Sequence, residues 1–584
     1  METTENNYPK WAEKAIWYQI FPERFCRAET PNYITANDLE GTTPWELTAK
    51  DPWQLHPWNE DWYKLQPYEK INNKDLKTNI LRRRFGGNIQ GIINKLDYLT
   101  DLGINAIYIC PLQYSPSLHK YDGTSFLHID PFFGNSPLED KKLIEEENFD
   151  DFENATWTAA DMLALEMIEQ AHKRGIKIIF DGVYNHIGYN SVPFKDVLKN
   201  REKSKYKDWF IIDFEKSTPQ KLVYEKFWGI VTEMPKLNYA CNDVKKYVFA
   251  ALKRWLCPIV NGKTYQGIDG WRIDHAIGVP LSFWKEACKY VKKLKKDALF
   301  LAELIEPEEI VLPYLKSDAF DSIMNYPLLF AMCRFFAAEK NSYSANDFNA
   351  NLEKLQKMFA IKNTMIMQNL LGSHDSERIS SYIVNRRLKK FGNNGEYWLK
   401  SHAEDKGYST RKPFERDRQI QKLMIIFQFC YIGAPMIYYG DEAGMWGAND
   451  PDCRKPMMWP EIKFEPENHD FNGNQTEKKY IVKFSVEMFN FYKKIIEIRK
   501  NTPSLTYGKF RTLYAPDNRR TYIFERKTYK ETVICVFNRE NFIIRTEIPL
   551  SKPCQDLLTN TNYYPQDGML KLSISAMSAM LLKY

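Results

Sequence analysis

Four acidic residues in this sequence each stand at or just past the end of a short apolar run. Asp181 lies in DGVYNH, Asp274 in GWRID, Glu303 in FLAEL and Asp375 in LLGSHD. A single acid at such a position can simply cap the next helix. Four in series, each after a predicted strand, favour one shared site instead. Carboxyl groups held close together repel one another and resist desolvation, so such clusters persist for catalysis or beside a compensating cation.

Two of these acids are suited to chemistry at a single bond. Cleavage of a glycosidic bond takes a carboxylic acid of raised pKa for the leaving oxygen and a carboxylate facing the anomeric carbon. Asp274 and Glu303 follow neighbouring predicted strands, so we expect their carboxyl groups about 5 Å apart, as in retaining enzymes. Arg272 points to the same side of its strand as Asp274 and is expected to keep that carboxylate ionised.

The apolar runs before these acids recur along the chain and alternate with amphipathic helical stretches such as 89–102 and 161–174. About eight such repeats predict a protein of the α/β class, a closed (β/α)8 TIM barrel whose parallel strands are covered by helices. The C-terminal ends of barrel strands share one mouth, where active sites form. The predicted strands are Ile16–Ile20, Ala106–Cys110, Ile176–Phe180, Trp271–Ile273, Ala298–Ala302, a weaker one at Phe320–Met324, Thr364–Leu371 and Pro435–Tyr439.

Two stretches depart from the barrel repeat. Residues 186–238, between the third strand and its helix, are too many for an ordinary connection and predict an inserted subdomain. After an amphipathic helix predicted over 477–500, the sequence TYIFERKTYKETVICVFNR predicts a hairpin. We therefore expect a catalytic barrel of residues 1–185 and 239–502, the inserted subdomain, and a C-terminal antiparallel β-sandwich of residues 503–584.

A long aromatic-rich loop, from about residue 25 to residue 81, follows the first predicted strand and should lie at the barrel mouth. Its rings either pack the loop down or stack on a ligand, and we expect one or two of them to touch substrate. The rings are Trp45, Trp53, Trp58, Trp62, Tyr63 and Tyr68.

The composition argues against several other classes of protein. The 584 residues are 44% hydrophobic and 27% charged, which is typical of a globular protein. The formal net charge of +6 is small for this length, so we expect no nucleic-acid partner. The ten cysteines show no C-x-x-C pair, so reduced thiols and no metal site are expected. Without a signal-like N-terminus or a long apolar span, we expect a cytoplasmic protein with no membrane contact, and the oligomeric state stays open.

Several further motifs accompany the acidic ones. With DGVYNH, GWRID, AE and SHD in this order, the sequence resembles the α-amylase family of glycoside hydrolases over nearly all of residues 16–584. The likeness is greatest to the neopullulanase and cyclomaltodextrinase branch of that family. The additional motifs that carry it are MPKLN (234–238), SPSLHKYD (115–122), IDPFFG (129–134), IYYGDE (437–442) and DPDCRKP (450–456).

The resemblance implies a role for each matched residue. Asp274 would be the nucleophile that forms a covalent glycosyl-enzyme, Glu303 the general acid and then the base, and Asp375 the residue that holds hydroxyls of the distorted sugar. Three further residues, Arg272, His186 and His374, would bind the same sugar, and Tyr121 would stack beneath it. Asp181 and Asn185 would fix the shape of the pocket. Asp450 and Arg454 would contact the next sugar.

Some of these implied roles have alternatives. An acid and a base four residues apart, as Asp450 and Arg454 are, can simply pair on a loop. From the residue types alone, neutral histidines are expected to serve as hydrogen-bond donors to sugar hydroxyls. His128, His172 and His275 are expected to be structural.

The sequence also departs from the family pattern. Members of the closest branch usually carry an extra N-terminal β domain, which we expect this chain to lack because its first predicted strand starts by Ile16. On the leaving-group side, Ile277-Gly278 replaces an Asn-Glu or Lys-His pair and Leu304 replaces a Trp, which leaves acceptor preference open. Asn88 stands where a calcium-binding Asp is expected, so we predict no required cofactor, while a weaker calcium site near Asn185 stays open.

Three functional hypotheses follow from the sequence. The first is a retaining α-glycosidase that hydrolyses α-1,4 bonds, with α-1,6 bonds as a second candidate linkage, in maltooligosaccharides, cyclodextrins, pullulan or starch fragments. The second keeps the site but passes the glucosyl group to a sugar, as a transglycosylase or isomerase does. The third is a non-catalytic carbohydrate-binding relative, which the presence of all three catalytic carboxylates disfavours.

Overall fold

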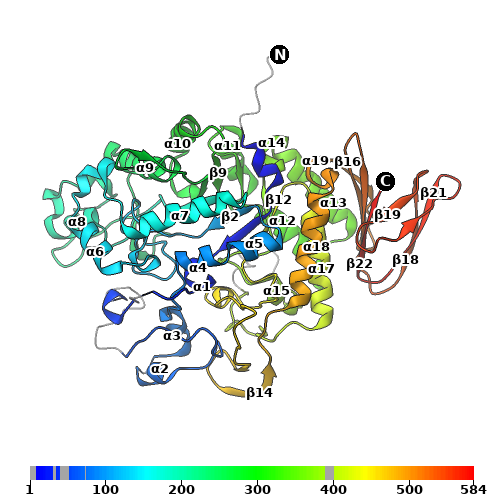
Figure 1. Cartoon of the computed structure of the whole chain (residues 1–584), viewed down its shortest axis with the longest axis horizontal. Helices are drawn as coiled ribbons and strands as arrows, with labels where there is room; N and C mark the ends of the chain where they lie inside the picture. The colour runs from blue at the N-terminus through cyan, green and yellow to red at the C-terminus, as the bar shows by residue number, and fades with distance from the viewer. Residues whose placement is uncertain (1–7, 31–33, 40–51, 73, 389–399) are drawn as a thin grey trace, which may run out of the picture.

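A computed structural model of the chain describes residues 8–30, 34–39, 52–72, 74–388 and 400–584 (Figure 1). At its centre the described residues form a sheet of eight parallel strands in the order β10-β9-β8-β3-β2-β1-β12-β11. A parallel bridge between Met324 and Gln368 joins the two ends of that order and closes the barrel. The strands are β1 (Trp17–Ile20), β2 (Ala106–Ile109), β3 (Lys177–Gly182), β8 (Gly270–Ile273), β9 (Leu299–Ala302), β10 (Ser322–Ile323), β11 (Gln368–Leu370) and β12 (Ala434–Tyr438).

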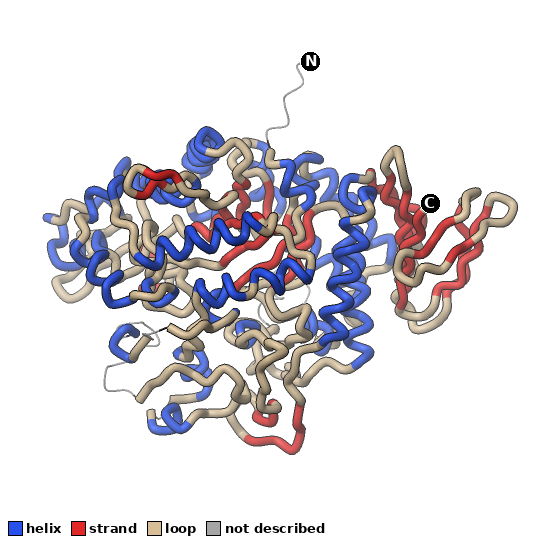
Figure 2. Tube along the Cα trace, viewed as in Figure 1, coloured by secondary structure: helices blue, strands red, loops and turns tan. Residues whose placement is uncertain are grey.

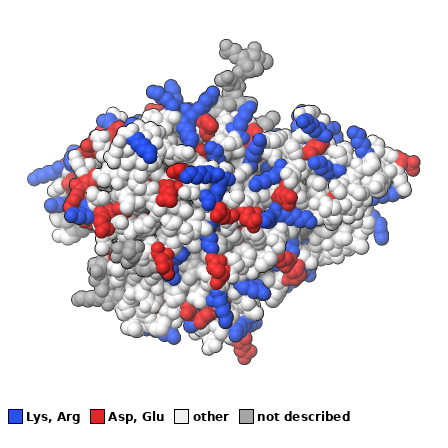
Figure 3. Space-filling view, in the orientation of Figure 1, with Lys and Arg blue, Asp and Glu red and all other residues white. Residues whose placement is uncertain are grey.

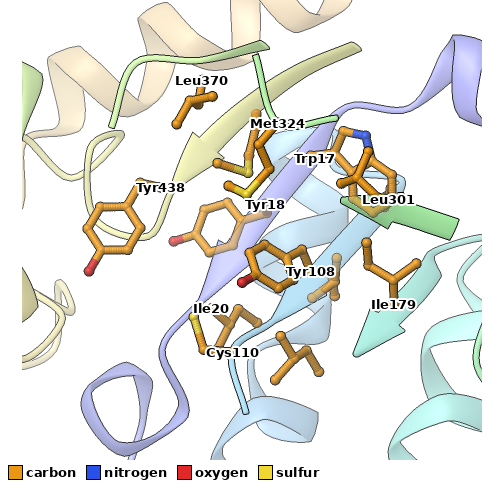
Figure 4. Close-up of a cluster of buried hydrophobic side chains, with 14 of the residues drawn as sticks. Trp17, Tyr18, Ile20, Tyr108, Cys110, Ile179, Leu301, Met324, Leu370 and Tyr438 are labelled. Atoms are coloured by element: carbon orange, nitrogen blue, oxygen red, sulfur yellow. The ribbon is translucent and has the colours of Figure 1, made fainter. Parts of the chain in front are cut away.

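The barrel strands are buried on both faces, which explains their continuous apolar runs. Figure 4 shows side chains from several strands, among them Trp17, Tyr108, Ile179 and Leu301, gathered in one buried cluster. Helices cover the outside (Figure 2), and the predicted stretch 89–102 forms two of them, with a break at Lys95. The main covering helices are α4 (Ile89–Asn94), α5 (Leu96–Leu102), α7 (Ala159–Lys173), α9 (Asn242–Leu256), α10 (Leu281–Leu294), α11 (Glu308–Lys316), α13 (Ala345–Met358), α17 (Glu415–Cys430) and α18 (Val486–Lys500).

Two predicted elements were wrong in extent. The run Thr364–Leu371 contributes only three residues to β11, because its start ends the short helix α14 (Ile361–Met365), where the Thr364 hydroxyl donates to the Ala360 carbonyl. A short apolar run does not by itself distinguish a strand from a buried helical turn. The helix predicted from residue 477 begins only at Val486, where the Ser485 side chain caps it by accepting from the Met488 amide.

The C-terminal region forms two antiparallel sheets (Figure 1, right). Alternate residues of the central strands face opposite ways. Phe524 and Phe537 pack on Phe427 of α17, whereas Ile523 and Val536 pack toward the smaller sheet. Both faces of the larger sheet are therefore buried at these strands, because successive side chains of a strand point to opposite faces. The smaller sheet pairs β18 (Ile544–Pro549) with β21 (Met569–Ile574). The larger sheet contains β15 (Lys509–Tyr514), β16 (Thr521–Lys527), β17 (Thr532–Asn538), β19 (Cys554–Asp556), β20 (Asn562–Tyr563) and β22 (Ser578–Lys583).

The chain between β3 and α9 contains the helix α8 (Val192–Asn200) and a hairpin of β4 (Lys226–Phe227) and β5 (Val231–Pro235). A bridge between His186 and Lys236 ties the two ends of this insertion together beside the barrel. We retain as a proposal the division into a barrel of 1–185 and 239–502, an insertion of 186–238 and a C-terminal β domain of 503–584.

Several aromatic rings of the long loop after β1 are buried against neighbouring segments of the chain, such as Trp58, whose Nε1 donates to the Met457 carbonyl. Trp58, Trp62 and Tyr63 are buried, and the Trp62 ring stacks on Phe85 with centroids 6.2 Å apart. The loop lies beside the segment before β13 (Glu467–His469), where the Glu465 amide donates to the Asn59 carbonyl. Trp45 lies outside the described residues.

The surface shown in Figure 3 carries Lys and Arg interspersed with Asp and Glu. Among the described residues, no helix combines the length and the apolar character needed to cross a bilayer.

Candidate active site

The predicted acids meet at the C-terminal rim of the barrel because hydrogen bonding between neighbouring strands continues past the strand ends. Asp181 pairs with Arg272 in the register of β3 and β8. Beyond β8 the Asp274 amide donates to the Gly182 carbonyl over 3.0 Å, and the Glu303 amide donates to the Ile273 carbonyl over 2.9 Å. This register holds Asp181, Asp274 and Glu303 on adjacent positions of one rim.

Arg272 is the cation that these three acids share. Its Nη1 donates to both Asp181 oxygens, at 2.8 and 2.9 Å, and to Asp274 Oδ1 at 3.1 Å. Its Nη2 lies 2.6 Å from Glu303 Oε1. The Arg272 side chain is fully buried, whereas those of Asp274 and Glu303 are 10% and 12% exposed. The two carboxyl groups therefore flank one guanidinium and open toward solvent.

The sharing of Arg272 changes the expected charge of Asp274. Burial and the Glu303 carboxyl raise the pKa of Asp274 well above its ordinary value, although Arg272 opposes that rise. Burial likewise raises the pKa of Glu303 against Arg272. Arg272 thus lowers the pKa of Asp274, as expected, but burial and Glu303 outweigh it in the free site, where one positive charge is divided among three carboxylates. The Asp274–Glu303 pair titrates as a unit that holds a proton to higher pH than an isolated carboxyl group.

Asp375 and His374 lie after β11 on another part of the rim. Asp375 Oδ2 lies 3.0 Å from His374 Nε2, and Asp375 Oδ1 accepts from Arg454 Nη2 over 3.2 Å. Burial opposes the charged form, but His374 and Arg454 outweigh it and hold the pKa of Asp375 below its usual range. With its side chain 36% exposed, Asp375 presents an ionised carboxylate at the opening.

His374 is charged, contrary to the expectation of a neutral ring. Burial disfavours the cation, yet the Asp375 carboxylate raises the pKa of His374 to about 10. Its Nδ1 lies 2.8 Å from the side-chain amide of Gln19, and its Nε2 lies 2.5 Å from the Tyr121 hydroxyl. The Nε2–H of the ring can donate to the Asp375 carboxylate and the Tyr121 oxygen, which orients the ring between them.

The other predicted site residues divide into pocket-lining and supporting groups. Tyr121 is half-buried, and its ring lies nearly parallel to that of His374 at 5.3 Å. Asp181 is buried, with Oδ2 accepting from the hydroxyls of Tyr121 and Tyr108, at 2.8 and 2.5 Å. His186 is fully buried, its Nε2 lies 2.9 Å from the Tyr121 carbonyl oxygen, and burial lowers its pKa to about 4. Asp181 and His186 therefore support Tyr121 from below.

Arg454 connects two parts of the rim. Its Nη1 lies 2.9 Å from Asp450 Oδ1, which is the local pairing anticipated for an acid and a base four residues apart. Its Nε also donates to the His374 carbonyl over 2.8 Å. Asp450 is 39% exposed, so its carboxylate remains accessible at the opening.

Sequence reasoning missed two residues of this site. Gln19 on β1 and Tyr108 on β2 point inward to His374 and Asp181, and each is a polar group inside an apolar strand, which was the available signal. The backbone amide of His275, which was expected to be structural, donates to Glu303 Oε2 over 3.1 Å. His275 adopts a left-handed φ of 41° directly after Asp274, which turns the chain toward the acid.

The unusual Gly278 has a steric reason. A Cβ added there would lie 2.1 Å from Asn185 Oδ1. We expect Gly278→Ala to lower the free energy of unfolding by about 1–3 kcal/mol, because Asn185 is buried and must shift. Urea unfolding measures this change. Gly372→Ala, where the nearest atoms lie at 3.6 Å, is the matched control. Equal stability of the two variants would contradict the steric account.

The residues at the family's calcium position do not fit a calcium ion. Asn88 caps α4, accepting from the Gly91 amide over 2.8 Å, and it donates to the Ala28 carbonyl. Asn185 Oδ1 is buried without a hydrogen-bond partner among the described residues, but calcium takes six to eight oxygens. No group of three or more His, Cys, Asp or Glu side chains in the described part of the chain could hold a metal ion. The absence of a required cofactor stays a prediction.

A TIM barrel with a carboxylate pair at its C-terminal mouth is typical of glycoside-cleaving enzymes. Comparison with known proteins shows which family of these enzymes the chain resembles. Residues 19–508 match the family model of the α-amylase catalytic domain. Neopullulanase 2 of Thermoactinomyces vulgaris is 33% identical over 579 residues, covering 98% of this chain and 78% of the relative. Cyclomaltodextrinase of Thermoanaerobacter pseudethanolicus is 35% identical over 535 residues, which cover 91% of this chain and 71% of that relative.

A solved cyclomaltodextrinase structure matches the fold with a TM-score of 0.71 at 29% identity, covering 98% of this chain and 79% of that one. The resemblance inferred from the motifs is thereby confirmed. The chain belongs to the α-amylase family of glycoside hydrolases.

Proposed function

We propose that this enzyme hydrolyses α-1,4-glucosidic bonds of short α-glucans by a retaining mechanism. The observation that carries the proposal is the placement of Asp274 and Glu303 on the two Nη atoms of one buried guanidinium. Carboxyl groups that lie this close together favour direct attack of a carboxylate on the sugar. In the inverting arrangement the two carboxyl groups lie farther apart, because a water molecule must enter beside the sugar.

The chemistry proceeds in two steps. In the first, an Asp274 oxygen attacks the anomeric carbon while the glycosidic C–O bond breaks and Glu303 gives its proton to the leaving oxygen. In the second, Glu303 takes a proton from water, whose oxygen displaces Asp274 from the anomeric carbon. The raised pKa of Glu303 keeps the acid protonated for the first step. Asp274 is the ionised partner in the productive state, in which the pair holds one proton.

The surrounding residues are proposed to bind the sugar whose bond is cleaved. Asp375 and the charged His374 supply an acceptor and a donor for its hydroxyls, and Tyr121 supplies a ring on which it stacks. Arg272, Asp181 and His186 hold these groups in place, and Asp450 lies exposed for the next sugar. The names of the relatives, neopullulanase and cyclomaltodextrinase, support pullulan, cyclodextrins and maltooligosaccharides as candidate substrates, with α-1,6 bonds as a second linkage.

The retaining mechanism predicts the configuration of the first-formed product. Hydrolysis of maltotriose, β-cyclodextrin, pullulan and soluble starch, followed by proton NMR during the first minutes, should show an α-anomer before mutarotation. Chromatography of the same samples identifies the linkage and chain length that the enzyme prefers. A β-anomer as the first product would contradict the two-step mechanism.

The shared proton predicts a bell-shaped pH dependence of kcat/KM. Activity requires Asp274 ionised and Glu303 protonated, so it rises as the pair loses its first proton and falls as it loses the second. Because both folded-state pKa values are raised, the acidic limb should lie above the range of an isolated carboxyl group. In Glu303→Gln the basic limb should disappear for a substrate with an activated leaving group. An unchanged basic limb in that variant would remove Glu303 from the acid role.

A transglycosylase is the second candidate, because the acceptor side departs from the family pattern and its preference is open. Leu304, which replaces the usual Trp after the acid, is 1% exposed and offers no ring to an acceptor sugar, which by itself favours transfer to water. The product spectrum with and without added maltose separates the two outcomes, because a transglycosylase converts the covalent intermediate into longer sugars at the expense of water.

We propose a cytoplasmic location for the enzyme. All ten cysteines are free thiols, eight of them buried, which fits a reducing compartment. We also propose that the enzyme acts without a bound metal, nucleic acid or membrane.

A further inference from the structure

Arg539 is a buried cation without an acidic partner, at the place where the barrel meets the C-terminal sheets (Figure 1). It follows β17 directly and is 4% exposed. Its Nε donates to the Phe336 carbonyl in the π-helical turn η8 (Cys333–Ala337), but within the described chain its two Nη atoms form no ion pair and donate no hydrogen bond. Burying a charge without a partner is unfavourable, so this arrangement points to a ligand.

A second buried arginine of the same sheet shows what internal satisfaction looks like. Arg526 is also buried and forms no ion pair with the described residues. Each of its three nitrogens, however, donates to a backbone carbonyl: Nε to Gly508, Nη1 to Cys430 and Nη2 to Thr506. The contact of Arg539 with the end of η8 explains only its Nε, and its Nη donors are left for a bound group.

Three more arginines surround Arg539, and together the four form an arginine cluster. Burial lowers the pKa of Arg539, and Arg520, Arg386 and Arg416 lower it further, to about 9. The Arg539 amide donates to the Arg520 carbonyl over 2.9 Å, so these two residues lie side by side. Guanidinium groups are charged at neutral pH, and the members of the cluster therefore repel one another.

The acids close to the arginine cluster do not balance its charge. Asp417 and Glu339 both pair with Arg386. Glu540 instead accepts from the Arg520 backbone amide over 2.7 Å. In the part of the chain that the structure describes, the other three arginines of the cluster form no ion pair. Three of the four cations therefore lack an anion.

A groove beside the cluster can admit that anion. It has a volume of about 460 Å³ and lies between the start of α17 and two turns of the C-terminal sheets. Arg416 lines it and donates from Nη2 to Asn541 Oδ1 over 3.1 Å. The side-chain amides of Gln419 and Asn541 can donate to further ligand oxygens. The remaining lining residues are Ala576 and Met577. The groove is large enough for a phosphate group with a sugar attached.

We propose that the arginine cluster and this groove bind a phosphate group, free or carried by a sugar phosphate. Guanidinium groups bind phosphate oxygens through paired N–H donors, and a phosphate dianion compensates more than one cation. The bound group would join Arg539 of the C-terminal sheets to Arg416 of α17 and so stabilise the junction between them. Neither Asp274 nor Glu303 takes part, so the site does not depend on the proposed function.

Calorimetric titration of the full chain with inorganic phosphate tests the site, with sodium chloride at equal ionic strength as the reference. Phosphate should bind with a dissociation constant of about 1 mM or below. Arg539→Met should weaken binding about tenfold or more, because a hydrogen bond to a charged group contributes that much. Arg511→Met is the matched control, since Arg511 is an exposed arginine of β15 that pairs with Glu525, and it should bind phosphate as the parent does. A response to phosphate no larger than that to chloride would overturn the proposal.

A second variant keeps the test valid if Arg539→Met folds poorly. Arg416 is exposed, so Arg416→Met should keep the parent's melting temperature in phosphate-free buffer and still weaken phosphate binding. Glucose 6-phosphate distinguishes the two sources of the ligand. Binding tighter than that of inorganic phosphate, and weakened in both variants, indicates a sugar phosphate, whereas equal binding indicates free phosphate. If both variants bind phosphate as tightly as the parent, the anion binds elsewhere and the arginine cluster is not its site.

Discussion

Asp274→Asn is expected to lower kcat on maltooligosaccharides by on the order of 10⁴-fold or more while leaving the fold intact. The amide has the size of the carboxyl group but cannot form the covalent glycosyl intermediate. Burial and Glu303 raise the folded-state pKa of Asp274, so its ionised form is disfavoured in the folded enzyme. The protonated Asp274 side chain therefore adds to the free energy of unfolding at low pH. This contribution is complete below the ordinary pKa of an aspartate and is lost as the pH rises through the raised pKa of the folded state.

At neutral pH the neutral amide should therefore give a melting temperature equal to or above that of the parent. Steady-state kinetics and thermal unfolding measure the two effects. Asp321→Asn is the matched control, because Asp321 is another buried carboxyl of raised pKa, but it lies before β10 and pairs with Lys292 at 2.6 Å. That variant should keep its activity. Equal turnover by Asp274→Asn and the parent would remove Asp274 from the nucleophile role.

Arg272→Met should lower the free energy of unfolding by about 3–5 kcal/mol at neutral pH and abolish activity. The substitution keeps most of the side-chain volume but strands three carboxylates that the guanidinium contacts directly. Without the cation the pKa values of Asp274 and Glu303 rise further in the folded state. The variant should therefore recover stability as the pH is lowered through those raised values and the acids take up protons. Urea unfolding between neutral and mildly acidic pH measures this recovery.

Two companion variants test the cause of that loss. Arg378→Met removes a fully buried arginine that pairs with the single carboxylate of Asp441, so it should destabilise the fold but retain activity. Adding Asp181→Asn to Arg272→Met removes one stranded charge and should restore part of the stability. If the double variant is no more stable than Arg272→Met, the loss comes from packing and not from uncompensated charge.

The barrel and the identity of the candidate catalytic acids could be predicted from the sequence because both depend on local patterns. Buried strands of a parallel sheet read as apolar runs, and each of Asp181, Asp274, Glu303 and Asp375 stands just after one of them. The two strand-like runs of TYIFERKTYKETVICVFNR, joined by a polar turn, likewise predicted the hairpin of β16 and β17. Element boundaries were less predictable: the helix expected from residue 477 starts at Val486, because a cap at Ser485 decides it.

The charge states and the supporting contacts were decided only by the tertiary structure. Arg272 is two residues from Asp274 in sequence, yet it is also shared with Asp181 and Glu303 from neighbouring strands, so the pKa of Asp274 rises where a local pair would lower it. The pKa of His374 is raised because the fold holds its ring against the Asp375 carboxylate, which outweighs the effect of burial. A pKa depends on every charge and dipole within a few ångströms and on exclusion of water, and these are properties of the folded arrangement that no spacing of residues along the chain contains.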